Sequence, residues 1–411
     1  MVKYERFTLN NGLKVLVHED KSTPMAVLNI LYDVGARDET PDKTGFAHLF
    51  EHLMFGGSVN IPQFDLPLQR VGGESNAFTS NDITNYYITL PAINLETAFW
   101  LESDRMLSLA FNEKSLETQK QVVSEEFKQR YLNQPYGDVW LRLRPLAYKE
   151  HPYKWATIGK EISHIELASM QDVKAFFSKH YTPQNAILVI AGDVELDAVK
   201  SLAEKWFGSI PAGNKYIRHI LPEPKQSEPR REVIKANVPV NSLYIAFHMN
   251  DRRSKAYYTC DLISDILSRG NSSRLFRRLV KERGLFSEIN AYLLGSLDNG
   301  LFLIEGKPLP GTTMELAEQA IWEQLGDLQQ VPVLNYELEK VKNKIESTMV
   351  FAEMSILDKA MNLAYFELLG NADMLNEEIA NYLNVSAKAI QETAQQLFQL
   401  ENSSTLVYLA D

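Results

Sequence analysis

Apolar and polar residues follow strand-like patterns in the N-terminal part of the chain. Residues 4–18 contain two such runs around an Asn-Asn-Gly turn, which predicts a β-hairpin. An apolar run over residues 25–34 predicts a third strand. Two shorter patterns, residues 75–79 and 84–90, flank a polar turn and predict the edge of a sheet. An exposed edge could take up an extended peptide, although an ordinary edge hairpin explains the same pattern.

Between these strands, residues 44–57 form a helical pattern that is apolar almost all round. We expect Thr44 to be its N-cap and the glycine pair at its end to stop it. Such a helix belongs in the interior of a protein. Its only central polar groups are His48, Glu51 and His52, which the spacing i, i+3, i+4 places on one face.

These three side chains are candidates for a metal site. Two histidines one turn apart form half of a zinc site, and Glu51 lies where a base could act on metal-bound water. The alternative is a pair of core histidines bonded to the backbone, with Glu51 pairing one of them. The complete His-x-x-Glu-His pattern in an apolar setting favours zinc.

Two further helices are predicted downstream, over residues 94–109 and 113–131, and Asn112 is the expected N-cap of the second. The predicted buried stripe of that helix consists of Leu116, Val123, Phe127 and Tyr131. Glu126 flanks the stripe, whereas Glu125 points to the opposite side. A third zinc ligand must come from a buried face, so we choose Glu126. The alternative is that both glutamates are solvated charges.

The second half of the chain repeats the first. Residues 260–271 align with residues 47–58, and their apolar positions agree. The candidate ligand positions of this copy carry Asp261, Ser264 and Asp265, so the packing pattern is kept and the ligands are lost. The chain also ends in STLVYLAD, which matches AILVIAGD before the middle of the sequence.

The duplication predicts an α+β fold with two similar domains, each an antiparallel sheet covered by helices. A polar stretch with several prolines separates the two halves and is predicted to be a linker. We expect a metal-bearing domain over residues 1–215, a linker over residues 216–232, and a domain without metal ligands over residues 233–411.

Composition narrows the possible functions. The chain has 411 residues, of which 45% are hydrophobic and 23% charged, as in ordinary globular proteins. Its net charge of −11 argues against nucleic acid as the main partner. The single cysteine, Cys260, excludes an intrachain disulfide and indicates a reducing compartment. No segment has the pattern of a membrane span or a signal peptide, so we expect the cytoplasm, or the periplasm if a signal peptide has been removed.

The assembled motifs resemble the pitrilysin family of zinc peptidases, the inverzincins. The segments that carry the resemblance are TGFAHLFEHLMFGG, GGESNAFTSNDITNYYITLP, QVVSEEFKQRYLNQPYG, HPYKWATIG and the strand before Gly192-Asp193. The resemblance covers the whole chain and is greatest to the small bacterial processing-type subunits. It implies the processing-peptidase fold and a zinc-dependent endopeptidase that cleaves oligopeptides or extended polypeptide segments.

The resemblance also implies roles for individual residues. His48, His52 and Glu126 would bind one zinc ion per chain, and Glu51 would be the general base. The predicted substrate-binding strand consists of Asn76, Ala77, Phe78 and Thr79, with Asn76 contacting the peptide backbone. Two such chains would close around a chamber that admits peptides and excludes most folded proteins.

Two departures from the family pattern affect the functional prediction. Gln119 stands where relatives often have a second acidic residue, from which we expect a modest effect. Active relatives also have an Arg and a Tyr that stabilise the oxyanion, and Val280 and Ser287 stand in their places. We therefore predict the zinc subunit of a heterodimer, completed by a paralogous chain with the Arg/Tyr pair.

Two alternatives to the heterodimer remain open. In a homodimer, nearby arginines could replace the missing one, and the candidates are Arg274, Arg277, Arg278 and Arg283. An ordinary solvated basic patch explains the same four residues. The second alternative is a non-catalytic peptide-binding or assembly subunit of a related complex.

Overall fold

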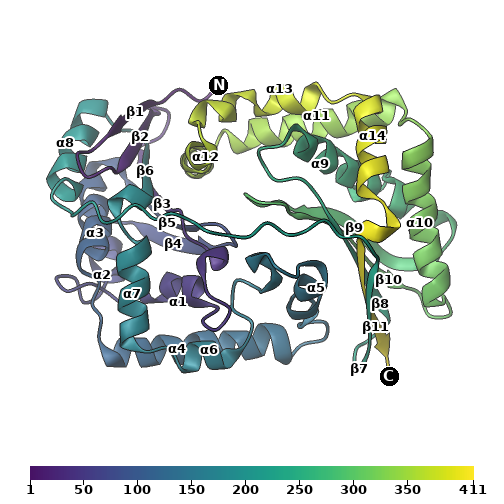
Figure 1. Cartoon of the computed structure of the whole chain (residues 1–411). Helices are drawn as coiled ribbons and strands as arrows, with labels where there is room; N and C mark the ends of the chain where they lie inside the picture. The colour runs from purple at the N-terminus through teal and green to yellow at the C-terminus, as the bar shows by residue number, and fades with distance from the viewer. The chain divides into compact units, whose positions relative to one another are not determined.

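The chain forms two compact units, and each unit contains more than one segment of the sequence. A computed structural model describes all residues, 1–411 (Figure 1). The first unit comprises residues 1–128, 155–220 and 350–377, and the second comprises residues 129–154, 221–349 and 378–411. The predicted domain boundaries at residues 215 and 233 describe the duplication in the sequence. These sequence boundaries stay a prediction, because the two units are defined by the packing of the chain and not by the repeat in its sequence.

A six-stranded mixed sheet forms the centre of the first unit. Its strands, in spatial order, are β1 (Glu5–Thr8), β2 (Lys14–Glu19), β6 (Ala186–Gly192), β3 (Met25–Tyr32), β5 (Thr84–Pro91) and β4 (Glu74–Thr79). β2 and β6 are parallel, and every other neighbouring pair is antiparallel. β3 and β6 are buried along almost their whole length, which explains their continuous apolar sequences. β4 lies at one edge of the sheet, as the sequence predicts.

The five-stranded sheet of the second unit has the same topology. Its strands, in spatial order, are β7 (Arg230–Ala236), β11 (Ser403–Ala410), β8 (Ser242–His248), β10 (Leu301–Pro308) and β9 (Phe286–Leu294). β7 and β11 are parallel, and the remaining pairs are antiparallel, so the order repeats that of the first sheet without β1. The duplicated α+β fold is therefore confirmed, with one parallel pair in each sheet that the sequence analysis did not include.

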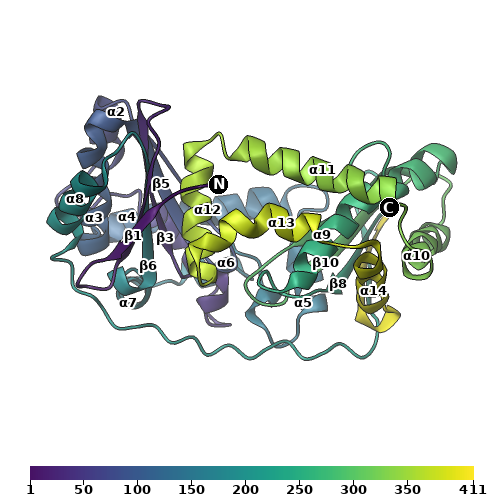
Figure 2. The ribbon, with the colours of Figure 1, turned by 90° about the horizontal axis from the view of Figure 1, so that it is seen from above.

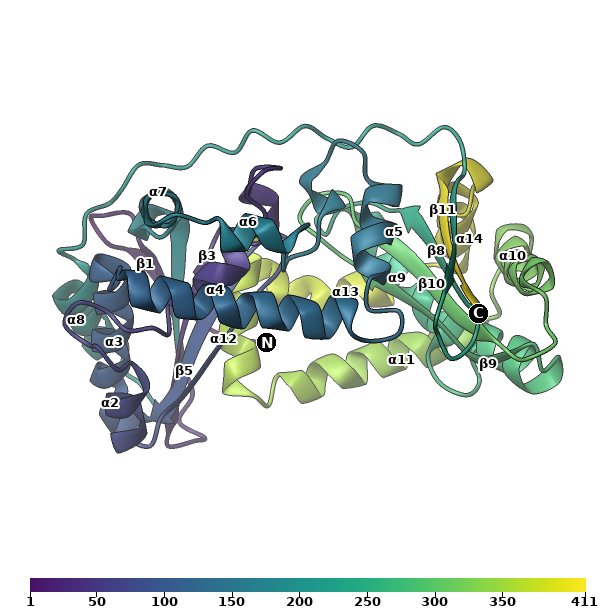
Figure 3. The same cartoon turned by 90° about the horizontal axis from the view of Figure 1, so that it is seen from below.

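Helices pack around both sheets. The first unit contains α1 (Phe46–Leu53), α2 (Asp65–Arg70), α3 (Leu95–Ser108), α4 (Glu113–Phe127), α6 (Ile162–Glu166), α7 (Met170–His180), α8 (Leu196–Phe207) and α12 (Ile356–Leu369). α4 contacts α1. It also contacts α6, which lies beside it in Figure 3. The side chain of Asn112 caps α4 as predicted, because its Oδ1 accepts a hydrogen bond of 2.7 Å from the backbone N–H of Ser115. Beyond Phe127 the chain continues as a π-helical turn, Lys128–Leu132.

The second unit has a similar set of helices. They are α5 (Val139–Ala147), α9 (Lys255–Ser268), α10 (Met314–Gln330), α11 (Asn335–Ala352, which ends in the first unit), α13 (Glu378–Leu383) and α14 (Ala387–Leu397). α9 follows β8 as α1 follows β3, so the predicted alignment of these two helices agrees with the topology. None of the helices has both the length and the apolar character required to cross a bilayer.

Each half of the sequence contributes one helix to the unit that is built mainly from the other half. α12, from the second half, packs on β3 and β6 of the first unit (Figure 2). Its buried Ala360 and Leu363 join an apolar cluster with Val27 and Val189 of these strands. Conversely, α5 packs on β8 and β11 of the second unit. Sequence patterns could predict that these helices have a buried face, but not which sheet would cover it.

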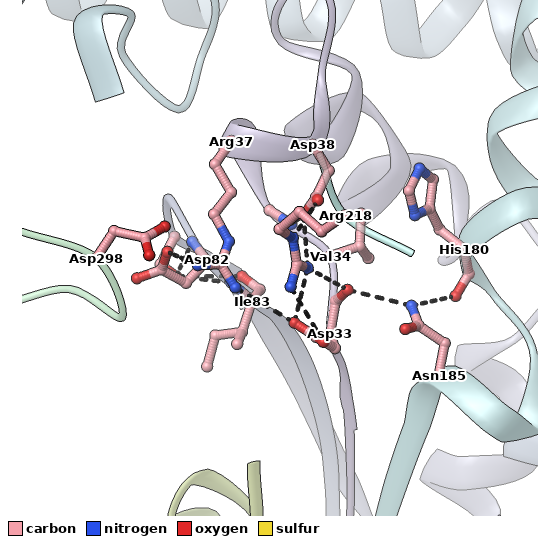
Figure 4. A network of polar contacts seen from close by, with 12 residues as sticks. Asp33, Val34, Arg37, Asp38, Asp82, Ile83, His180, Asn185, Arg218 and Asp298 are labelled. Atoms are coloured by element: carbon pink, nitrogen blue, oxygen red, sulfur yellow. Dashed lines mark hydrogen bonds and ion pairs between the residues drawn. The ribbon is translucent and has the colours of Figure 1, made fainter. Parts of the chain in front are cut away.

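Part of the predicted linker is fixed to the first unit by ion pairs. The Arg218 guanidinium donates to Asp38 Oδ1 at 2.7 Å and to Asp33 Oδ1 at 2.8 Å (Figure 4). The carboxylate of Asp38 is fully buried, and it also accepts from the N–H of Gly35. Arg218 thereby stabilises the short 3-10 helix Ala36–Asp38, which leads into the segment before α1.

A buried histidine lies beside this network, at the end of α7. His180 has no exposed surface, and its ring contacts the rings of Phe176 and Tyr216, each with a centroid distance of 4.6 Å. Neither ring nitrogen has a hydrogen-bond partner. Burial lowers the pKa of His180 to about 3, because the charged imidazolium cannot be solvated, and Lys179 and Arg218 add to this effect.

The buried His180 predicts a specific pH dependence of stability. At pH values between about 3 and 6.5, His180 binds a proton in the unfolded chain but not in the folded one. Acidification through this range therefore favours unfolding. His180→Phe keeps the aromatic contacts and cannot be protonated. We expect wild type to lose about 2 kcal/mol relative to this variant when the pH falls from 7 to 5. Urea unfolding at both pH values measures the difference, and parallel pH profiles would contradict the prediction.

Candidate metal centre

The helix that carries the candidate ligands begins one residue later than it would with Thr44 as its N-cap. α1 starts at Phe46, and its N-cap is Gly45, whose φ of 87° lies in the left-handed region. A Cβ at Gly45 would lie 2.6 Å from the carbonyl oxygen of Ile158, so this position requires glycine. The prediction that Thr44 caps the helix is wrong. Its hydroxyl instead lies 2.8 Å from Nδ1 of His164 and accepts from the N–H of Lys160.

The cap of α1 comes from a residue that the sequence analysis did not identify. Glu39 Oε2 accepts from the N–H of Gly45 and Glu39 Oε1 accepts from the N–H of Ala47, both at 2.8 Å. A carboxylate at this end of a helix is also favoured by the helix dipole. Glu39 is only 8% exposed, and burial raises its pKa, although these two hydrogen bonds lower it. Its separation from the helix in sequence explains why no capping motif revealed it.

The structure brings together the three side chains that the sequence analysis proposed as metal ligands. Glu126 Oε2 of α4 lies 3.4 Å from His52 Nε2 and 3.7 Å from His48 Nε2. The side chains of His48, His52 and Glu126 are 12%, 24% and 18% exposed, so the cluster is shielded but accessible. Glu125 instead pairs with Lys128 at 2.7 Å, on the exposed side of α4. Glu126, and not Glu125, therefore lies beside the two histidines, while its role as a zinc ligand stays a prediction.

The distances and the chemistry of this cluster fit a zinc ion. In a tetrahedral site with bonds of about 2.0–2.2 Å, neighbouring ligand atoms are about 3.3–3.6 Å apart. The separations of 3.4 and 3.7 Å come close to this range before any adjustment. Two imidazoles and one carboxylate are also a donor set of catalytic zinc sites, in which the fourth position stays open. The ligand atoms of His48, His52 and Glu126 all lie within 4.8 Å of one another, and no other group of three such side chains in the chain converges in this way.

Glu51, the predicted base, lies on the same face of α1 and contacts the edge strand. Its Oε2 accepts a hydrogen bond of 2.6 Å from the hydroxyl of Thr79, at the end of β4. Thr79 is predicted from its sequence position to bind peptide, and its contact with Glu51 is additional to that prediction. No local pattern could reveal it, because the two residues belong to different elements.

The remaining residues of the predicted substrate strand alternate along β4. Ala77 is half-buried, whereas Asn76 and Phe78 are exposed. Asn76 Oδ1 accepts from the backbone N–H of Ala77 at 2.8 Å. The edge position of β4 leaves backbone groups available for a peptide, but the assignment of these residues to substrate binding stays a prediction.

The second unit has no obvious substitute for the missing oxyanion-binding pair. Val280 packs against the apolar core of that unit, and the Ser287 hydroxyl donates to the carbonyl of Lys307 at 3.1 Å. The four arginines considered as substitutes all have carboxylate partners: Arg274 pairs with Glu337, Arg277 with Glu282, Arg278 with Asp327, and Arg283 with Glu323. These ion pairs favour a structural role for the arginines.

Comparisons with known proteins find similar chains along nearly the whole sequence. The model of the Insulinase family (Peptidase family M16) matches residues 14–159, and a model described as the Peptidase M16 inactive domain matches residues 168–345. The zinc protease PqqE of Helicobacter pylori is 32% identical, over 99% of this chain and 93% of that protein. An uncharacterized zinc protease of Bacillus subtilis, YmxG, is 26% identical over 98% of each chain. The crystal structure of a protease from Helicobacter pylori superposes with a TM-score of 0.94 at 30% identity, over 99% of this chain and 100% of that one.

The capping role of Glu39 can be tested by stability. Glu39→Gln leaves one oxygen acceptor for two N–H groups, so one buried N–H of α1 loses its partner. We expect the free energy of unfolding to fall by about 1–3 kcal/mol, measured by urea denaturation of the metal-free protein. Glu117→Gln, at an exposed position of α4, is the control and should change stability little. Equal stability of the two variants would contradict the capping role.

Proposed function

Because this chain belongs to the M16 family of peptidases, we propose that it is a zinc-dependent endopeptidase that cleaves oligopeptides or extended polypeptide segments. The observation that carries the proposal is the convergence of His48, His52 and Glu126 at separations that fit tetrahedral zinc, with Glu51 on the same helix face. The relatives from Helicobacter pylori and Bacillus subtilis are both named zinc proteases, which supports zinc as the metal.

The proposed mechanism assigns one task to each group of residues. His48, His52 and Glu126 would hold one zinc ion, which supplies Lewis acidity toward the scissile carbonyl and the attacking water. Glu51 takes a proton from the attacking water and delivers it to the nitrogen of the leaving amine. The open edge of β4 fixes the register of the peptide by backbone hydrogen bonds.

The proposed enzyme is completed by a second chain. Val280 and Ser287 occupy the places of the Arg and Tyr of active relatives, and neither side chain can stabilise an oxyanion as that pair does. A paralogous subunit with the Arg/Tyr pair would supply these groups in a heterodimer, and a homodimer is the alternative. The cytoplasm stays the predicted compartment, with the periplasm as the alternative.

A second candidate function follows from the same two positions. A chain without its own oxyanion-binding pair could hold peptides, or assemble with other subunits, without cleaving them. The match of residues 168–345 to the model described as an inactive domain also favours this candidate.

Zinc binding is the first test of the proposal. We expect about one zinc per chain in the wild-type protein after dialysis, measured by mass spectrometry of the metal. Glu126→Ala should weaken zinc binding by at least about a hundredfold. Removing a residue that only hydrogen-bonds to a metal ligand already lowers metal affinity by up to about a hundredfold, and loss of a ligand itself should cost more. Glu125→Ala, the matched control on the opposite side of α4, should retain zinc. Equal zinc affinity of the two variants would exclude Glu126 from the site.

Peptide cleavage is the second test. Glu51→Gln should lower kcat/KM by about 10²–10⁴-fold and leave the zinc content unchanged, because the amide cannot accept the proton. The assay uses the chain alone and mixed with its candidate partner subunit. Activity in the mixture alone supports the heterodimer. Zinc-loaded protein that binds peptide tightly and never cleaves it supports the non-catalytic candidate. Undiminished cleavage by Glu51→Gln would rule out the proposed mechanism.

A further inference from the structure

One hydrogen bond joins the edge strand of the first sheet to the proposed base. The Thr79 hydroxyl donates to Glu51 Oε2 at 2.6 Å, and both side chains are partly buried. Hydrogen bonds to a carboxylate are stronger and shorter than those between neutral groups. The terminal torsion of a glutamate is broad, so an isolated Glu51 carboxylate could rotate freely. The bond from Thr79 restricts that rotation and leaves Oε1 for proton transfer.

The pairing of β4 with β5 determines where the backbone of Thr79 points. Thr79 is paired with Thr84, and the next residue, Ser80, donates its N–H to the carbonyl of Ile83 at 2.8 Å. Antiparallel pairs alternate between hydrogen-bonded and non-hydrogen-bonded positions. Since Ser80 occupies a bonded position, Thr79 occupies a non-bonded one, and its N–H and C=O face the open edge. The N–H of Ala77, two residues away, bonds to Asn76 Oδ1, as this alternation predicts.

Thr79 therefore has two separate connections. Its backbone belongs to the edge on which an extended peptide would add a strand. Its side chain points toward α1, where the hydroxyl donates to the carboxylate of Glu51. The short side chain of Thr79 thus holds the proposed base next to the edge along which a peptide would pair. This contact differs from the role in peptide recognition that the sequence analysis assigned to Thr79.

We propose that Thr79 is a positioning residue, which orients the Glu51 carboxylate for proton transfer beside the edge of β4 on which a peptide would bind. The proposal rests on the proposed peptidase function. It predicts that the Thr79 hydroxyl acts on turnover and leaves peptide affinity and zinc binding unchanged.

Three variants separate this role from the alternatives. Thr79→Val removes the hydroxyl and keeps the shape and the strand preference of the side chain, whereas Thr79→Ser keeps the hydroxyl. Ser75→Ala is the matched control, because Ser75 is another half-buried hydroxyl residue of β4 with the same side-chain parity as Thr79. Each variant is assayed in the assembly in which the wild-type protein is active, with an oligopeptide that this assembly cleaves. Glu51→Gln is the reference for loss of the base.

The expected result is a change in kcat alone. Thr79→Val should lower kcat by about tenfold or more, because a misplaced catalytic group loses rate, with KM and zinc content within about twofold of wild type. Thr79→Ser should restore most of the rate, and Ser75→Ala should match wild type. In an independent measurement without turnover, calorimetry should give the same peptide Kd for Glu51→Gln and for Glu51→Gln combined with Thr79→Val.

Several results would overturn the proposal. If wild type cleaves, Glu51→Gln does not, and Thr79→Val keeps the wild-type kcat, the Thr79 proposal is wrong while the proposed function stands. A higher KM or a weaker peptide Kd without a change in kcat would assign Thr79 to peptide binding. Equal losses in Thr79→Val and Thr79→Ser would make its role structural. If no assembly containing the wild-type chain cleaves peptides, the proposed function has failed, and the Thr79 proposal fails with it.

Discussion

The placement of α1 is the constraint on which the candidate site depends. A helix of eight residues is too short to be stable in water by itself, so its surroundings must stabilise it. Phe46 and Phe50 are buried, and Phe50 stacks on Phe176 with a centroid distance of 5.0 Å. Glu39 binds the N–H groups at the start of the helix. Because one face is fixed by burial, the opposite face, with Glu51 and the two histidines, has a defined direction toward α4.

The separation of two interacting residues along the sequence decided whether their interaction could be predicted. The spacing of the two histidines and Glu51 on one helix face is a local signal, and so is the period that distinguishes Glu126 from Glu125. The duplicated fold could be predicted because both halves keep the same apolar pattern. The cap by Glu39, the hydroxyl bond of Thr79 and the exchange of α5 and α12 join elements that are distant in the sequence. Such contacts depend on the complete fold, so no local pattern revealed them.

The second half of the chain illustrates how a duplicated helix can keep its packing without the metal ligands. On α9, Asp261 accepts a hydrogen bond of 2.6 Å from the hydroxyl of Tyr382, and Asp265 pairs with Arg269 at 3.3 Å. Burial raises the pKa of Asp261, which Tyr382 partly offsets. The polar positions of this helix thus serve contacts within the second unit. On this helix, Asp261 and Asp265 stand where α1 has its two candidate metal ligands, although the two sheets have the same topology.

The central claim is that two imidazoles of α1 and one carboxylate of α4 share a single metal ion. Anomalous X-ray diffraction at the zinc absorption edge, from crystals grown with zinc, measures this directly. The account predicts one strong peak in the first unit, at about 2.0–2.2 Å from Nε2 of His48, Nε2 of His52 and a carboxylate oxygen of Glu126. A zinc peak bound elsewhere, with these three atoms beyond bonding distance, would contradict it.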